Sequence, residues 1–151
     1  MDDKKVILLV EDNPDDEILT IRALNKNHIR NEVVVAHDGA EALDYIFGTG
    51  AFAGRNLNEL PEVVLLDLKL PKVDGLEVLK RIRAERRTKL LPVVMLTSSL
   101  EQVDLARCYA NGVNSYVRKP VDFVQFMEVA KQLGMYWLVV NNPPPEIGST
   151  T

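Results

Sequence analysis

Short apolar runs recur along the chain and are too continuous for half-exposed strands. Val, Leu and Ile dominate most of these runs, and polar residues do not alternate with them. This pattern is typical of strands that are buried on both faces of a parallel sheet. We expect five such strands, at residues 6–10, 32–36, 63–66, 93–96 and 115–117.

A helical pattern follows each run, with apolar residues three and four positions apart. Polar residues that commonly cap helices mark where most of these helices begin. The expected caps are Asn13 before Pro14, Asp38 before Gly39, Ser98 and Ser99 with Glu101 and Gln102 three residues on, and Asp122. Another helix is expected from Gly75 to Glu85, and the one after the fourth strand should stop at Gly112.

Five strand–helix units in strict alternation predict an α/β fold, a doubly wound five-stranded parallel sheet with helices on both faces. Two segments do not fit the alternation. Residues 48–61 contain three glycines and are expected to form a long surface loop. Residues 141–151 contain Pro143–Pro145 and are expected to form an extended tail beyond a domain of residues 1–140.

The last helix carries more apolar side chains than one face of a sheet needs. Its expected inward positions are Phe123, Phe126 or Met127, Ala130, Leu133, Trp137 and Val140. Ordinary core packing is one explanation. The other is a homodimer formed through this helix and its neighbours, because large exposed apolar patches usually mark interfaces.

Composition excludes several classes of protein. Cys108 is the single cysteine in 151 residues, which excludes a disulfide framework and a cysteine-based zinc site. Apolar runs of five residues are far short of the roughly 20 that span a membrane, so we expect a cytoplasmic protein without membrane contact. The net charge of −4 argues against binding nucleic acid. Basic residues between 80 and 89 are interpreted as a solvated helix face.

The acidic excess is local. Seven acids and two bases lie in residues 1–17. Asp15, Asp16 and Glu17 are explained as the first turn of a helix, where the helix dipole favours negative charge. Glu11 and Asp12 directly follow the first strand and need another explanation.

Ligand sites of open α/β sheets lie beyond the carboxyl ends of the strands. Glu11 and Asp12 end the first strand, Asp67 the third, Thr97 the fourth, and Lys119 follows the fifth. One acid after a strand is usually a cap, but suitable residues at four strand ends are a stronger pattern. Three neighbouring carboxylates repel one another unless a hard cation such as Mg²⁺ binds. With a lysine and a hydroxyl, they suit phosphoryl transfer.

These residues resemble the receiver domain of two-component response regulators. The resemblance rests on Glu11-Asp12, Asp67 in Leu-Leu-Asp-Leu-Lys-Leu-Pro, Asp74-Gly75, Thr97-Ser98 and Tyr116-Val-Arg-Lys-Pro120, and it covers residues 5–140. The loop 48–61 and the ending 136–140 are further similar to single-domain regulators that partner bacterial phytochrome-type histidine kinases. The resemblance implies a flavodoxin-like sheet with strand order 2-1-3-4-5.

The resemblance also implies roles for the strand-end residues. Asp67 would accept a phosphoryl group from a phosphohistidine of a sensor histidine kinase. Asp12, Asp67 and the backbone carbonyl of Lys69 would bind Mg²⁺, and Glu11 would contact the ion directly or through water. Lys119 would pair with the phosphoryl oxygens.

A second set of implied roles concerns signalling. Thr97 would move to bond the phosphoryl group, and Tyr116 would swing inward behind it. The Lys119–Pro120 bond is often cis in the family. Because Lys69 lies two residues after the acceptor, we hypothesise that its side chain shields the phosphoryl group from water. The output would be an altered surface for partner binding.

Two other functions stay open at this point. A Mg²⁺-dependent aspartyl-phosphate phosphohydrolase would use the same carboxylates, but commonly carries an acid where this chain has Lys69. A receiver-like binding module would never carry phosphate, although the set of Asp12, Asp67, Thr97 and Lys119 disfavours it.

Overall fold

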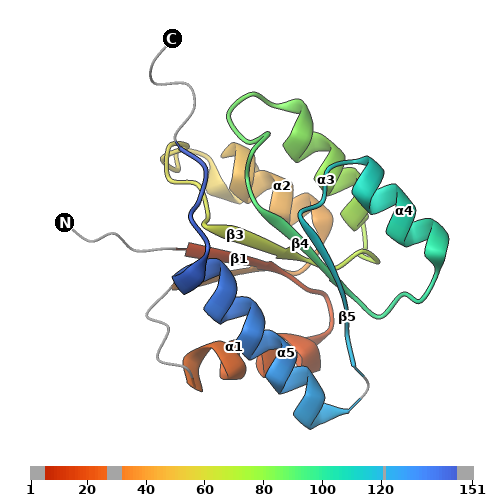
Figure 1. Ribbon diagram of the computed structural model, residues 1–151. Helices are drawn as coiled ribbons and strands as arrows, with labels where there is room; N and C mark the ends of the chain where they lie inside the picture. Colours follow the sequence, from red (N-terminus) through yellow and green to blue (C-terminus); the bar gives the residue numbers. More distant parts are fainter. Residues whose placement is uncertain (1–5, 27–31, 121, 146–151) are drawn as a thin grey trace.

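The computed structural model describes residues 6–26, 32–120 and 122–145 as a parallel sheet covered by helices on both faces (Figure 1). The strand order is β2-β1-β3-β4-β5, which confirms the predicted fold class and topology. The strands are β1 (Val6–Val10), β2 (Glu32–Ala36), β3 (Val63–Leu66), β4 (Val93–Thr97) and β5 (Ser115–Arg118).

The helices divide into two layers. The α-helices are α1 (Pro14–Lys26), α2 (Gly39–Phe47), α3 (Gly75–Ala84), α4 (Gln102–Ala110) and α5 (Phe123–Met135), and α5 continues as a π-helical segment at Tyr136–Val140. Helices α1 and α5 pack side by side on one face of the sheet, and α2, α3 and α4 cover the other (Figure 1). None of the described helices is long and apolar enough to cross a membrane.

Alternate residues of each central strand enter different cores. Leu8 and Val10 pack with the layer of α2, α3 and α4, whereas Ile7 and Leu9 pack with α1 and α5. All four side chains are at most 1% exposed. This burial on both faces is the physical reason that β1 lacks polar alternation.

Most of the expected caps form. The Asn13 side chain accepts hydrogen bonds from the backbone N–H groups of Asp15 and Asp16, and Asp38 and Asp122 cap α2 and α5. The capping boxes expected at Ser98 and Ser99 are wrong. Helix α4 begins only at Gln102, and the Ser99 Oγ accepts from the Glu101 N–H just before the helix while its hydroxyl donates to the side chain of Asp104.

The loop 48–61 and the basic segment 80–89 have more structure than their composition predicts. The loop 48–61 contains a 3₁₀ turn at Gly50–Phe52. Arg87 donates to the carbonyls of Leu57 and Ile46, and Arg83 donates to three acceptors in the segments that lead into β4 and β5. The basic residues Lys80, Arg81, Arg86 and Lys89 are exposed, as expected of a solvated helix face and following loop, whereas Arg83 and Arg87 tie loops together.

The last helix also departs from its expected packing. Ala130, Phe126 and Trp137 are buried as predicted, but Phe123 and Val140 are 53% and 63% exposed. Both lie at the ends of the helical segment, Phe123 at its first residue and Val140 at its last. Residues 141–145 follow without regular structure, and the rest of the tail lies outside the described residues.

Candidate functional site

Polar residues converge where the carboxyl ends of β1, β3, β4 and β5 meet. Backbone hydrogen bonds continue the ladders just beyond the strands and fix these positions. The Glu11 N–H donates to the Ala36 carbonyl, and the Asp67 N–H donates to the Val10 carbonyl at 3.1 Å. The Lys119 N–H donates to the Thr97 carbonyl at 2.7 Å. The sheet itself therefore holds the strand-end residues next to one another.

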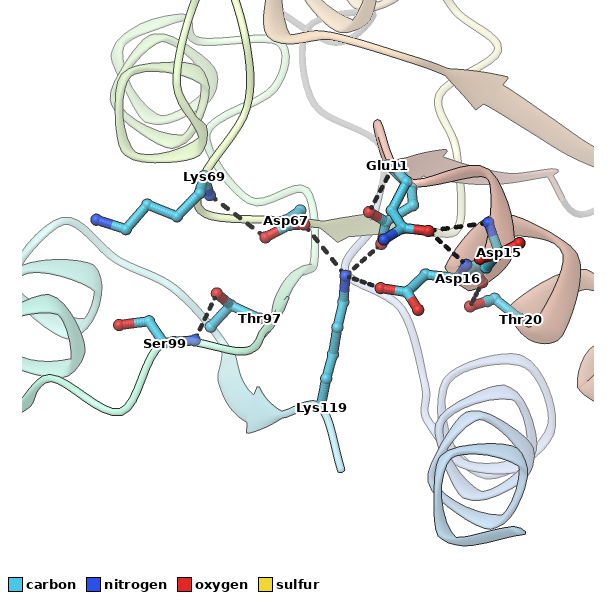
Figure 2. A network of polar contacts seen from close by, with 10 residues as sticks. Glu11, Asp15, Asp16, Thr20, Asp67, Lys69, Thr97, Ser99 and Lys119 are labelled. Atoms are coloured by element: carbon cyan, nitrogen blue, oxygen red, sulfur yellow. Dashed lines mark hydrogen bonds and ion pairs between the residues drawn. The ribbon is translucent and has the colours of Figure 1, made fainter. Parts of the chain in front are cut away.

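The Lys119 ammonium is the centre of the cluster (Figure 2). Its Nζ lies 2.5 Å from Glu11 Oε1, 2.9 Å from Asp16 Oδ2 and 3.1 Å from Asp67 Oδ2, and the side chain is only 6% exposed. The described chain contains no cis peptide bond, so a cis Lys119–Pro120 bond is wrong for this structure. The ammonium reaches the carboxylates because the backbone of Lys119 is tied to Thr97.

Asp16 is a member of the site that the sequence did not single out. It lies in the first turn of α1, where an acid is already explained by the helix dipole. In the structure its carboxylate turns toward the sheet edge and pairs with Lys119, and its side chain is 25% exposed. The available signal was its position one turn after the acids that end β1.

Three carboxylates of the cluster have the geometry of a cation site. Glu11, Asp12 and Asp67 each offer an oxygen, and these oxygens lie within 4.8 Å of one another. Glu11 and Asp67 are buried, while Asp12 is exposed and leaves one side open to water. An all-oxygen donor set with room for water ligands fits Mg²⁺.

The electrostatics show an excess of negative charge. Burial raises the pKa of Glu11 to about 7, although the hydrogen bond and charge of Lys119 act in the opposite direction. Burial alone would lower the pKa of Lys119, but its hydrogen bond with Glu11 and the charge of Asp67 raise the pKa instead. Lys119 therefore stays an ammonium, and Glu11 holds a proton more easily than an ordinary glutamate.

Asp67 lies at the centre of the edge and is held from two sides. Its Oδ1 accepts a hydrogen bond from the Lys69 N–H at 3.3 Å, and its Oδ2 pairs with Lys119. Gly75 packs so closely behind it that a Cβ there would collide with the Asp67 carbonyl. The side chain is 11% exposed, so it is held firmly but not sealed.

The residues with implied switching roles lie beside this edge. Thr97 is fully buried, and its Oγ1 accepts a hydrogen bond from the Ser99 N–H at 3.1 Å. The Tyr116 hydroxyl is buried without a hydrogen-bond partner among the described residues, and burial raises the pKa of this group. The Lys69 ammonium is directed away from Asp67 and pairs with Asp104 at 3.5 Å (Figure 2).

Comparison with known proteins agrees with this arrangement. Residues 7–131 match the family model of the response regulator receiver domain. The probable methanogenesis regulatory protein FilR2 of Methanothrix harundinacea is 42% identical over 95% of this chain and 90% of its own.

Solved structures extend the comparison. The bacteriophytochrome response regulator AtBRR is 53% identical, with a TM-score of 0.72, over 93% of this chain and 100% of its own. The Mn²⁺-bound form of the response regulator Rcp1 is 33% identical, with a TM-score of 0.87, over 93% of this chain and 99% of its own. The matched family model, the strand order and the relatives together show that the chain belongs to the response regulator receiver domain family, whose members work in two-component signalling.

Proposed function

We propose that Asp67 is the phosphoacceptor of this receiver and takes its phosphoryl group from a sensor histidine kinase. The observation that carries the proposal is the convergence of Glu11, Asp67 and Lys119 in one buried cluster, with Asp12 at its open side. We infer that Glu11, Asp12, Asp67 and the backbone carbonyl of Lys69 hold Mg²⁺. The Mn²⁺ bound by the related Rcp1 supports a divalent cation.

The residues of the cluster would have different roles in the phosphoryl transfer. An Asp67 carboxylate oxygen attacks the phosphorus of the phosphohistidine, an O–P bond forms, and the P–N bond breaks with its electrons returning to the imidazole. Mg²⁺ held by the carboxylates of the cluster and the Lys69 carbonyl would supply positive charge for the phosphoryl oxygens. Lys119 already contacts Asp67 and would pair with a phosphoryl oxygen, while the nearly buried carboxylate limits access of water.

Thr97 and Tyr116 are suited to report the phosphorylation. The Thr97 hydroxyl accepts from Ser99, so its own hydrogen is available for a phosphoryl oxygen. The Tyr116 hydroxyl is already buried and makes no hydrogen bond within the described residues, so only packing opposes its repositioning when Thr97 moves. We propose that these two movements change the surface of α4, β5 and α5 and thereby the binding of partners.

The phosphohydrolase is disfavoured by the residue that follows the acceptor. Lys69 occupies the position of the second acid that such enzymes commonly use as proton donor. Its ammonium points toward α4 and not into the site. We propose that any loss of the phosphoryl group is the slow hydrolysis of the receiver's own aspartyl phosphate.

Mass measurement of the intact protein tests the proposal. Incubation with Mg²⁺ and phosphoramidate should add one phosphoryl group, and Asp67→Asn should abolish the adduct. Asp15→Asn is the matched control, because Asp15 is exposed and its side chain does not join the cluster. Rapid turnover of the donor would favour the hydrolase. An adduct on another residue, or none even with a kinase, would refute the assignment.

We propose further that the protein forms a homodimer in the cytoplasm and receives its signal from a bacteriophytochrome-type kinase. The similarity to the bacteriophytochrome response regulator AtBRR supports the kinase. Large apolar side chains exposed on α4, α5 and their flanks support the dimer: Leu100, Val103, Tyr109, Phe123, Val124, Met135, Tyr136, Val139 and Val140. Sedimentation with Val124→Asp should weaken self-association, and Leu90→Asp is the control elsewhere on the surface. A monomeric wild type, phosphorylated or not, would exclude the dimer.

A further inference from the structure

Asp104 is a buried acid outside the phosphorylation cluster. It lies in the first turn of α4 and is 8% exposed, although most neighbouring residues of that helix face solvent. The Ser99 hydroxyl donates to its Oδ2 at 2.6 Å, and the Lys69 ammonium lies 3.5 Å from the same oxygen. Burial of a carboxylate is costly unless it is paired, so these two contacts hold Asp104 in place.

These contacts form a continuous path from the proposed phosphoacceptor to the proposed switch residue. The Lys69 N–H donates to Asp67, and the Lys69 ammonium pairs with Asp104. Ser99 donates to Asp104 through its hydroxyl and to Thr97 Oγ1 through its N–H. Figure 2 shows Lys69, Thr97 and Ser99 along the same side of Asp67. Asp104 is therefore where the loop after β3 and the loop after β4 are joined.

A phosphoryl group on Asp67 would compete for the Lys69 ammonium at one end of this path and for the Thr97 hydroxyl at the other. The Lys69 side chain is 67% exposed and long enough to move. A phosphoryl group on Asp67 would offer it a second and more highly charged partner. Rotation of Thr97 toward the phosphoryl group would remove the acceptor of the Ser99 N–H. The hydrogen bond from Ser99 and the charge of Lys69 lower the pKa of Asp104, so this carboxylate remains ionised and competes as an anion.

We propose that Asp104 is a positioning residue that holds Lys69 and the segment from Thr97 to Ser99 in their unphosphorylated arrangement. This inference rests on the proposed function of Asp67. A contact made only in the unphosphorylated state weakens the retention of a phosphoryl group by the free energy of that contact. Asp104 thus sets how readily this receiver becomes and stays activated, without touching the reacting atoms.

Binding of beryllofluoride, a mimic of the phosphoryl group, tests the inference in the presence of Mg²⁺. Asp104→Asn keeps the shape of the side chain and an acceptor for Ser99 but removes the charge that holds Lys69. Affinity for the mimic should rise about two- to tenfold. Glu101→Gln is the matched control. It removes an acid from the same loop, and the Glu101 side chain makes no capping hydrogen bond. Its affinity should equal that of wild type.

A double-mutant cycle separates positioning from a merely structural role. If Asp104 acts through Lys69, Asp104→Asn should have a much smaller effect in the Lys69→Gln background. An undiminished effect there, or unchanged or weaker affinity in the single variant, overturns the inference. If Asp104→Asn does not fold, Ser99→Ala removes the other contact and must also raise the affinity. A wild type that binds no mimic contradicts the proposed function, whereas a binding wild type with an unaltered variant contradicts only the role of Asp104.

Discussion

Replacement of Lys119 by Met removes the positive charge from the buried cluster while keeping most of the side-chain volume. The ammonium contacts three carboxylates, and two of them are nearly inaccessible: Glu11 at 2% and Asp67 at 11% side-chain exposure. Without it, these acids would repel one another in a poorly solvated position. We therefore expect Lys119→Met to destabilise the fold as well as to impair phosphorylation.

The size of the expected loss of stability follows from the burial of the carboxylates that pair with Lys119. Removing one member of a buried ion pair costs about 3–5 kcal/mol. Asp16 is a quarter exposed and keeps part of its hydration, and Glu11 can take up a proton because its pKa is already about 7. Both responses reduce the cost, so we expect a loss of about 3 kcal/mol in the free energy of unfolding without divalent cations.

Mg²⁺ should recover part of the lost stability, because the same carboxylates can bind it in place of the ammonium. Urea unfolding of wild type and Lys119→Met, with and without Mg²⁺, measures both effects. The gain from Mg²⁺ should be larger in the variant. Lys131→Met, on the exposed face of α5, should be neutral under both conditions. A variant as stable as wild type without Mg²⁺, or an equal gain from Mg²⁺ in both proteins, would refute the reasoning.

Three further predictions concern the support of the site. Without Mg²⁺, the free energy of unfolding should fall as pH rises from 4.5 to about 7, because the folded state retains a proton on Glu11 that the unfolded chain loses. Glu11→Gln should remove this dependence on pH. Mg²⁺ should bind more tightly above this pH range. Gly75→Ala should cost about 1–3 kcal/mol in urea unfolding and slow phosphorylation, since the added Cβ meets the Asp67 backbone; phosphorylation at the wild-type rate would contradict it. Arg83→Met should cost about 1.5–3 kcal/mol, because the carbonyls of Leu91 and Gly112 lose their donor while Asn114 keeps only the N–H of Val93. Arg81→Met loses only an exposed ion pair and should be near neutral in the same assay.

The central strands β1, β3 and β4 were predictable because they are buried on both sides and therefore apolar almost throughout. The edge strands β2 and β5 are only partly buried, and the strict strand–helix alternation located them. All five predicted strands agree with the structure to within one residue at each end. The start of α4 was not predictable in the same way. Ser98 and Ser99 have the spacing of a capping box, but the Ser99 Oγ accepts from the Glu101 N–H before the helix and donates to Asp104, a geometry that depends on how α4 packs.

The strand-end residues of the site were predictable for a topological reason. Parallel strands bring their carboxyl ends to one edge, so Asp67 and Lys119 meet although 52 residues separate them. The direction of a long side chain was not predictable. Lys69 was expected beside the phosphoryl position, whereas its ammonium contacts α4. Its proposed shielding of the phosphoryl group would require it to leave Asp104 first.

Acids in the first turns of helices show most clearly where sequence reasoning reaches its limit. Asp16, Glu41, Glu77 and Asp104 each lie three residues after the residue that precedes their helix, and the helix dipole accounts equally for all four. Glu41 accepts from the N–H of His37 and Glu77 pairs with an arginine on its own helix, so both act locally. Asp16 and Asp104 differ because a lysine from another strand end comes within 3.5 Å of each. A helix that follows a parallel strand starts at the edge where ligands bind, so each of its first-turn acids is a candidate for the site. Tertiary packing, by supplying or withholding a cation, decides which of them joins.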